Sequence, residues 1–215
     1  MQKINKSKII SLCVLLIAFA ILVGSIFFLK VKENQMPQFI SGARVINSDN
    51  RKLIGTEIKG ITPIIASSDE QKTKLDLEVA DKIPDNNIIK EVDNDEIVLP
   101  VSITNFKAVD GKTPEVIMTN GSLVLFVNGD KGGWKCKPGD KLMYKFEKYA
   151  TNITKSQSMV VGYILDGVLY QGNVMNDLSG TYQLDIAEAG EYYIYIISAT
   201  SDYLALKQGE ISISR

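Results

Sequence analysis

Four aromatic side chains in the C-terminal half of the chain are the residues best suited to bind a partner. They are Trp134, Tyr163, Tyr193 and Tyr195. Each combines a large apolar ring with one polar atom, and side chains of this kind are enriched at binding surfaces. The chemistry they offer is recognition, either of a protein or of a sugar. The competing interpretation places the same rings in the core or beneath the acidic region that precedes them.

The pair Ser158-Met159 is a candidate for nucleophilic catalysis. It is similar to the nucleophile motif of signal peptidases, which pair a serine with a lysine. That family continues its motif with a proline and has a Gly-Asp pair later in the chain. Here two valines follow the motif, and Gly139-Asp140 comes before it. We therefore predict that Met159 is a core residue.

The absence of histidine restricts the remaining chemistry. Without imidazole, the chain lacks the commonest general base and the commonest zinc ligand. The run Asp93-Asn94-Asp95-Glu96 offers oxygen ligands that suit Ca²⁺, but it lacks the glycine and the distal glutamate of an EF-hand loop. We interpret it as a solvated acidic loop, and we predict no catalytic residue, no metal site and no cofactor. The net charge of -1 gives no indication of nucleic-acid binding.

An apolar segment at residues 9–29 precedes all of these candidates. It contains no charged residue, and about 20 such residues in a helix cross the hydrocarbon core of a bilayer. It is longer than the apolar part of a signal peptide, so we predict an uncleaved transmembrane anchor. Lysines flank both ends in nearly equal number, and the short tail at residues 1–8 favours a cytoplasmic N-terminus. The rest of the chain is then extracytoplasmic, in the cell envelope.

Residues 30–114 are weakly patterned, and residues 69–96 within them are acidic. Such a stretch suits a stalk or a loosely packed collar. Residues 74–80 and 97–104 nevertheless have the alternating or continuous apolar pattern of strands. The sequence leaves open whether this region is a stalk or a part of the following domain.

Residues 115–215 have the pattern of an all-β domain, with short apolar runs separated by turn residues. Asn120-Gly121 and Asp166-Gly167 each lie between two such runs. Both dipeptides suit the positive φ angles of a type I′ turn, so they predict two antiparallel hairpins. The fold class predicted is an antiparallel, jelly-roll-like β-sandwich behind a single transmembrane helix.

The predicted strands differ in how many apolar faces they have. Residues 141–148 and 181–186 alternate between apolar and polar, as expected for strands with one wet face. Residues 159–165 and 191–199 are apolar on nearly both faces and should be central, with 141–148 and 181–186 as the expected neighbours of 191–199. The second face of 191–199 must then be covered by the collar, by another copy or by a partner. If 159–165 pairs with 191–199, Tyr163 could lie beside Tyr193 and Tyr195.

The C-terminal region resembles a loose group of bacterial extracytoplasmic β-sandwiches, including the pre-peptidase C-terminal type, and also the GOLD-type sandwich of membrane trafficking proteins. The resemblance covers roughly residues 133–214. It is carried by Pro138-Gly139-Asp140 before the strand at 141–148, by Ala189-Gly190-Glu191-Tyr192-Tyr193, and by Ser201-Asp202. The resemblance implies an accessory or interaction module, and it carries over no catalytic residue.

These observations favour a membrane-anchored, extracytoplasmic module that binds a protein or another component of the cell envelope. One alternative is a carbohydrate-binding module with exposed aromatic side chains. A minor alternative is a hydrolase that works without histidine. An exposed coplanar pair of rings would favour sugar, a flat apolar patch would favour protein, and a cleft with convergent carboxylates would favour the hydrolase.

Overall fold

The computed structural model of this chain describes residues 40–58, 88–94, 97, 100–129, 132–151, 153 and 156–215. The predicted tail at 1–8, the predicted anchor at 9–29 and the predicted strand at 74–80 lie outside these residues. Within them, no helix has the length and apolarity needed to cross a membrane.

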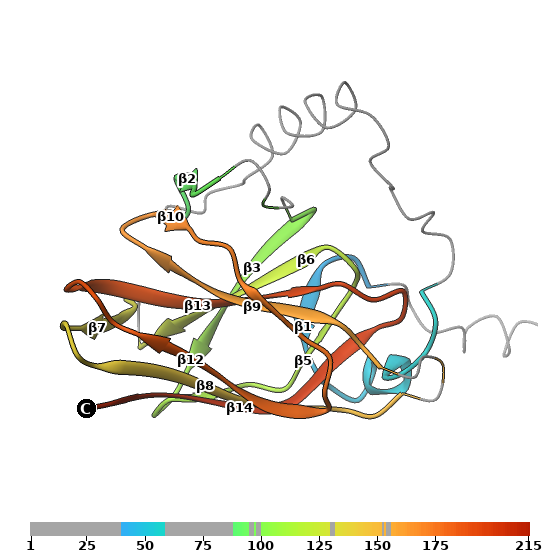
Figure 1. Cartoon of the computed structure of the whole chain (residues 1–215). Helices are drawn as coiled ribbons and strands as arrows, with labels where there is room; N and C mark the ends of the chain where they lie inside the picture. The colour runs from blue at the N-terminus through green and yellow to red at the C-terminus, as the bar shows by residue number, and fades with distance from the viewer. Residues whose placement is uncertain are drawn as a thin grey trace, which may run out of the picture. The chain divides into compact units, whose positions relative to one another are not determined.

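The described part of the chain is all-β and forms two sheets arranged as a sandwich (Figure 1). The six-stranded sheet has the order β1 (Ala43–Val45), β5 (Val116–Met118), β14 (Leu204–Ser214), β8 (Lys141–Lys148) and β12 (Ser179–Asp185), with β4 (Lys112–Thr113) paired to β14. The eight-stranded sheet has the order β2 (Glu91–Val92), β10 (Val168–Leu169), β9 (Met159–Leu165), β13 (Gly190–Ser198), β6 (Ser122–Asn128) and β3 (Ser102–Ala108). In this sheet β11 (Asn173–Met175) pairs with β9, and β7 (Trp134–Cys136) pairs with β13. One short 3₁₀ helix, η1, spans Arg51–Leu53.

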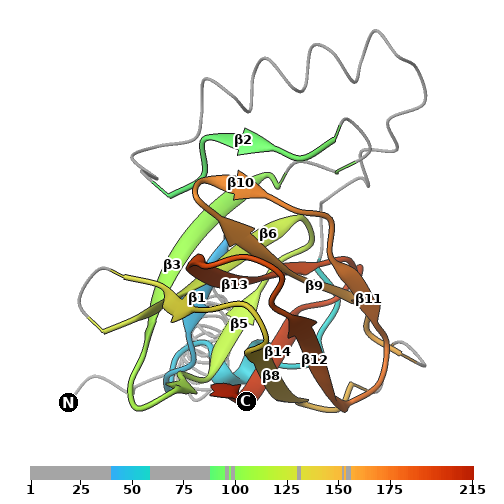
Figure 2. The same ribbon diagram turned by 60° about the vertical axis from the view of Figure 1, so that its left-hand side comes forward.

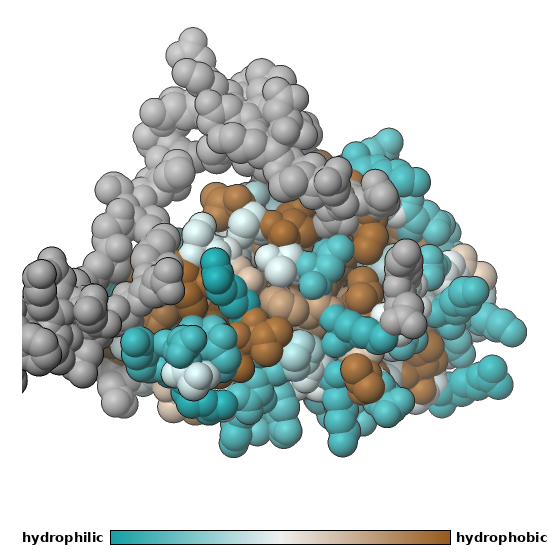
Figure 3. All heavy atoms as spheres, turned by 180° about the vertical axis from the view of Figure 1, so that it is seen from behind, coloured by the Kyte–Doolittle hydropathy of each residue, from teal (hydrophilic) through white to brown (hydrophobic). Residues whose placement is uncertain are grey.

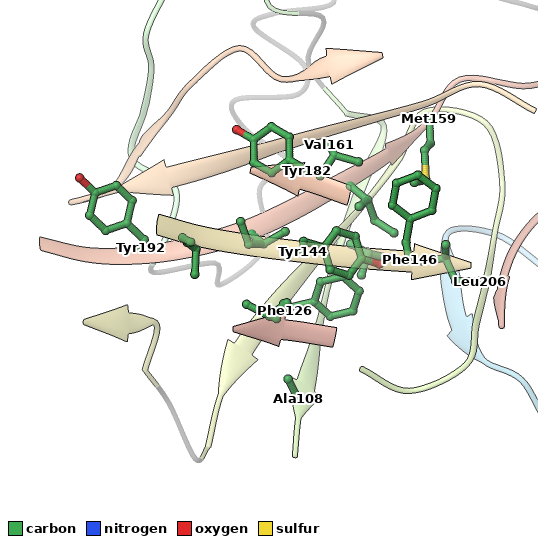
Figure 4. Packing of buried hydrophobic residues seen from close by; sticks show 14 of the residues in the cluster. Ala108, Phe126, Tyr144, Phe146, Met159, Val161, Tyr182, Tyr192 and Leu206 are labelled. Atoms are coloured by element: carbon green, nitrogen blue, oxygen red, sulfur yellow. The ribbon is translucent and has the colours of Figure 1, made fainter. Parts of the chain in front are cut away.

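The main core lies between the two sheets, because successive side chains of a strand point to opposite faces. The predicted inward row of β8, Leu142, Tyr144 and Phe146, is buried there, as is Tyr182 of β12. Figure 4 shows the rings of Phe126, Tyr144 and Phe146 gathered in this core. The ring centroids of Phe126 and Tyr144 are 5.6 Å apart. The prediction that these strands have one buried face is therefore confirmed.

Glycines opposite aromatic residues let three large rings lie flat across a neighbouring strand. Gly162 is in register with Tyr195, Gly180 with Phe146, and Gly209 lies beside Tyr144. A Cβ atom at any of the three glycines would come within 3 Å of the ring. Each glycine therefore provides the space that its ring occupies.

The β13 strand is buried on both faces, as its sequence predicts. Its even-numbered residues 192, 194 and 196 face the main core, whereas Tyr193 and Tyr195 belong to a second apolar cluster on the other face of the sheet. The predicted pairing of this strand with residues 159–165 is confirmed, because β13 pairs antiparallel with β9. The predicted neighbours 141–148 and 181–186 are wrong, because β8 and β12 lie in the other sheet.

Two features of the predicted architecture need correction. The sheets are not purely antiparallel, because β3 runs parallel to β6 and β2 runs parallel to β10. The boundary at residue 115 also does not separate a collar from the sandwich, since β1, β2, β3 and β4 precede it and pair within the two sheets. The described residues of the acidic, weakly patterned region 30–114 are thus part of the sandwich.

The two predicted hairpins have different outcomes. Asp166 and Gly167 both have positive φ and join β9 to β10 as an antiparallel hairpin, as predicted. The Asn120-Gly121 prediction is wrong, because β5 and β6 lie in different sheets. Only Gly121 of that pair has positive φ, and the Ser122 N–H donates to the Thr119 carbonyl at 3.1 Å. This is the pattern of a type II turn, and here it carries the chain from one sheet to the other.

Candidate functional site

The structure buries three of the four aromatic residues proposed for binding. Trp134 is 4% exposed, Tyr193 is 8% exposed and Tyr195 is 1% exposed. The two tyrosines pack with Ile89 and Ile97, which come from the region that precedes the predicted sandwich. The surplus apolar face of β13 is therefore covered by the chain itself, as the competing interpretation proposed.

Hydrogen bonding and electrostatics agree with this burial. The Tyr195 hydroxyl donates to the Tyr170 carbonyl oxygen at 2.6 Å. Burial raises the pKa of Tyr195 and also that of Tyr193, because removal from water disfavours the charged phenolate. These rings act as core residues with a satisfied polar tip, so they do not provide an exposed binding face.

Tyr163 lies on the opposite face of the sheet from Tyr193 and Tyr195. Although β9 and β13 pair, the register places Tyr163 opposite Ile194, and its ring packs against the main core. The Tyr163 ring stacks on Tyr170 with centroids 4.7 Å apart and planes 9° apart. Rings stacked face to face do not form the side-by-side platform expected of a sugar site, so the predicted grouping of these tyrosines is wrong.

The Ser158-Met159 motif is also a structural feature. Met159 is fully buried, which confirms the prediction that it is a core residue. The Ser158 hydroxyl donates to the Asn176 side-chain oxygen at 2.7 Å. Its proton is thus directed to an amide that cannot act as a general base.

Lys148 is a buried residue that the sequence did not single out. It continues the inward row of β8 and is 3% exposed. Its ammonium donates to the backbone oxygens of Gln157 at 2.5 Å, Asn176 at 3.1 Å and Met175 at 3.4 Å. Burial lowers the pKa of Lys148 to about 8, and the charge of Asp177 offsets part of that lowering. In the sequence, the only indication that Lys148 is buried was its place at the end of the inward row of an alternating strand.

A second buried polar group lies close to Lys148 along the same chain of contacts. Asp202 is completely buried, and its carboxylate accepts hydrogen bonds from Gln157 Nε2 at 2.8 Å and from Thr200 Oγ1. Gln157 therefore connects the two buried charges, through its backbone oxygen to Lys148 and through its side chain to Asp202. The arrangement joins the loop before β9 to β8 and to the segment that precedes β14, and it stabilises this end of the sandwich.

Two hollows in the described surface are each lined by two acidic residues, Glu147 and Glu210 in one and Asp166 and Glu191 in the other. A hollow of about 450 Å³ lies over β4, β8, β12 and β14, and in it Glu147 forms a salt bridge with Lys207 at 2.7 Å. A hollow of about 300 Å³ lies near Ile88 and Tyr193, and there Glu191 accepts a hydrogen bond from the Gly133 N–H at 2.9 Å. These contacts give a hydrolase no specific support.

The strongest candidate for recognition is the outer edge of β12. Residues of an antiparallel strand alternate between those that bond to the partner strand and those whose N–H and C=O point away. At the two ends of this ladder, the Lys148 N–H donates to the Leu178 carbonyl and the Ile186 N–H donates to the Asp140 carbonyl. With the observed register, the even-numbered residues of β12 bond to β8.

The backbone groups of the other β12 residues therefore point away from the sheet. These residues are Ser179, Thr181, Gln183 and Asp185, and all four are exposed. β12 is the last strand of its sheet and pairs only with β8 among the described strands (Figure 2). The edge thus directs a row of donors and acceptors away from the sheet along seven residues.

Apart from the charge of Asp185 at its C-terminal end, this edge lacks the features that usually prevent strands from pairing. Native edges are protected by short length, by lysine or by proline, and β12 has seven residues with neither lysine nor proline. Two other strands that end a described sheet do have such protection, because β1 has only three residues and β3 contains Lys107. The sequence of 181–186 predicted a half-buried strand, but only the topology places it at an edge.

Four partly buried apolar side chains pack against the main core, to which Tyr182 of β12 also belongs. They are Leu184 of β12, Tyr163 of β9, Met175 of β11, and Tyr170 from the connection between β10 and β11. On the face drawn in Figure 3, apolar residues are interrupted by hydrophilic ones over the coloured atoms. These four side chains, which we call the β12 shelf, are therefore the better candidate for a contact surface.

The edge and the shelf together can bind an extended peptide segment. The backbone groups would form a new ladder, and every second side chain of the bound segment would point to the shelf. Comparisons with known proteins add no further assignment: no family model, no curated protein and no solved structure matches this chain.

Proposed function

We propose that this chain is a membrane-anchored, extracytoplasmic binding module that captures an extended segment of a partner protein along β12. The observation that carries the proposal is the edge of β12, which no other described strand pairs with, together with the β12 shelf. A bound strand would satisfy the outward groups of four residues at once. Recognition by strand addition draws its affinity from main-chain hydrogen bonds and its specificity from the alternate side chains.

The location of the module is part of the same proposal. The uncharged segment 9–29 supports a single transmembrane anchor, and the short tail 1–8 supports a cytoplasmic N-terminus. The resemblance to bacterial extracytoplasmic sandwiches and their jelly-roll-like architecture is consistent with a role in the envelope. Protease added to intact cells or spheroplasts should remove the sandwich, whereas protection of residues 141–215 until lysis would exclude this orientation.

Site-specific photo-crosslinking tests the binding edge. A photoreactive amino acid at Thr181 should cross-link to a partner in intact membranes. The matched control is Lys145, which is exposed and lies directly opposite Thr181 on β8 but is not at the edge. Cross-links at Lys145 that equal those at Thr181 would contradict the proposal.

A pair of substitutions at Gln183 separates the backbone from the side chain. Gln183→Pro removes an N–H that points away from the sheet, and proline is tolerated at such edge positions. The loss of one hydrogen bond and the new steric contact should reduce capture by about tenfold or more. Gln183→Ala keeps the backbone N–H and should retain capture. The thermal unfolding of both variants should remain close to that of the parent, and equal capture by both would refute the backbone mechanism.

A further inference from the structure

We infer that the segment that binds to β12 is β12 of a second copy of this chain, so that two six-stranded sheets join edge to edge around a two-fold axis. The inference rests on the proposed function and names its partner. It comes from the spacing of the outward residues and from the position of the one charge on the strand.

The outward residues are self-complementary in one antiparallel register. A two-fold axis at Tyr182 places Ser179 opposite Asp185 of the second copy and Thr181 opposite Gln183. All four outward residues of each strand then pair with outward residues of the other strand. If the axis moves to Thr181 or Gln183, one outward residue at the end of each strand loses its partner. The axis at Tyr182 therefore satisfies the largest number of backbone groups.

The position of the one charged residue is compatible with the same register. Asp185 is the only charged residue of β12. Its carboxylate lies 3.9 Å from the ammonium of Lys141 on β8. With the axis at Tyr182, each Asp185 faces a serine, so the two carboxylates lie at opposite ends of the joined strands. Like charges placed directly opposite each other destabilise a ladder, and this register avoids that contact.

Side chains on the inner face would complete the contact. Tyr182 lies on the axis and would meet Tyr182 of the second copy. Leu184, which is only partly buried in the single chain, would lie beside Gly180 of the second copy. Leu184 of the β12 shelf would thus be removed from water at both ends of the joined strands. The fully buried part of an interface is usually apolar in this way.

Disulfide formation between single cysteines tests the register in the full-length chain. One copy carries Thr181→Cys and another carries Gln183→Cys, both with Cys13→Ser, co-expressed with different tags and oxidised in membranes. Paired residues in an antiparallel ladder have Cα atoms about 4.5–5.5 Å apart, which a disulfide spans. The mixed disulfide should exceed that of two copies with Lys145→Cys by at least about tenfold.

The outcomes separate this inference from the proposed function. A mixed disulfide no more abundant than the Lys145 control would overturn pairing between two copies. If the photoreactive Thr181 then cross-links to a different protein, the proposed function stands with another partner. If neither reaction occurs at β12, both proposals fail. A dominant disulfide between two Thr181→Cys copies would show that the strands pair with the axis at Thr181, and the register argued above would be wrong.

Discussion

Substitution of Gly162 by alanine tests how the eight-stranded sheet accommodates its buried rings. A Cβ atom at Gly162 would lie 2.5 Å from both Cζ and the hydroxyl oxygen of Tyr195. Real structures do not contain such contacts, so the ring must move. Tyr195 is fully surrounded by other residues and its hydroxyl bonds to the Tyr170 carbonyl. Movement of the ring therefore costs both packing and a hydrogen bond.

The expected loss can be estimated from these two contributions. Overpacking a core typically costs roughly 1–3 kcal/mol, and a lost hydrogen bond costs about 1 kcal/mol. Replacing glycine in a strand returns roughly 0.5–1 kcal/mol of conformational entropy. We expect Gly162→Ala to lower the free energy of unfolding by roughly 2–3 kcal/mol, or the thermal midpoint by roughly 5–10 °C. Denaturant titration of the purified chain measures the former directly.

A double-mutant cycle shows whether the ring is the cause. Tyr195→Leu alone should cost several kcal/mol, because it removes a buried ring and leaves a cavity. In the double variant, the new methyl group enters the space that the ring has left. The combined loss should therefore be smaller than the sum of the single losses by at least about 1 kcal/mol. Additivity within about 0.5 kcal/mol would refute the proposed steric conflict.

Three further predictions follow from the buried side chains. Burial lowers the pKa of Lys148 to about 8. Above that pH the unfolded chain therefore binds more protons than the folded chain. The free energy of unfolding should then rise by roughly 1–2 kcal/mol from pH 7.5 to 9.5. Urea titrations should show that Lys148→Met abolishes this rise, and an equal rise in the variant would assign it to other groups. Ile89→Ala should cost roughly 2 kcal/mol or more and increase hydrogen exchange at Tyr193, whereas unchanged exchange would mean that Ile89 does not cover the sheet. Burial raises the pKa of Tyr182 and of Tyr192 to about 12. Ultraviolet titration of the folded chain should therefore detect tyrosines that ionise well above pH 10. Complete ionisation of all tyrosines near pH 10 would contradict this prediction.

Local patterns in the sequence predicted the features that depend on neighbouring residues. The alternation of β8 and β12 identified their buried faces, because the two-residue period of a strand is a local property. Asp166-Gly167 identified a hairpin, since two successive residues with positive φ turn the chain back on itself. The apolar character of both faces of β13 likewise predicted a strand covered on both sides.

Only the tertiary structure decided which sheet each strand joins and which strand ends a sheet. Asn120-Gly121 forms a turn, but the pairing of β5 with β14 and of β6 with β13 makes that turn a connection between sheets. Strand pairing joins residues far apart in the sequence, so no local pattern specifies it. The same long-range pairing placed Tyr163 on the opposite face from Tyr195 and covered Tyr195 with residues from before the predicted domain. It also placed the polar row of β12 at the edge of its sheet among the described strands.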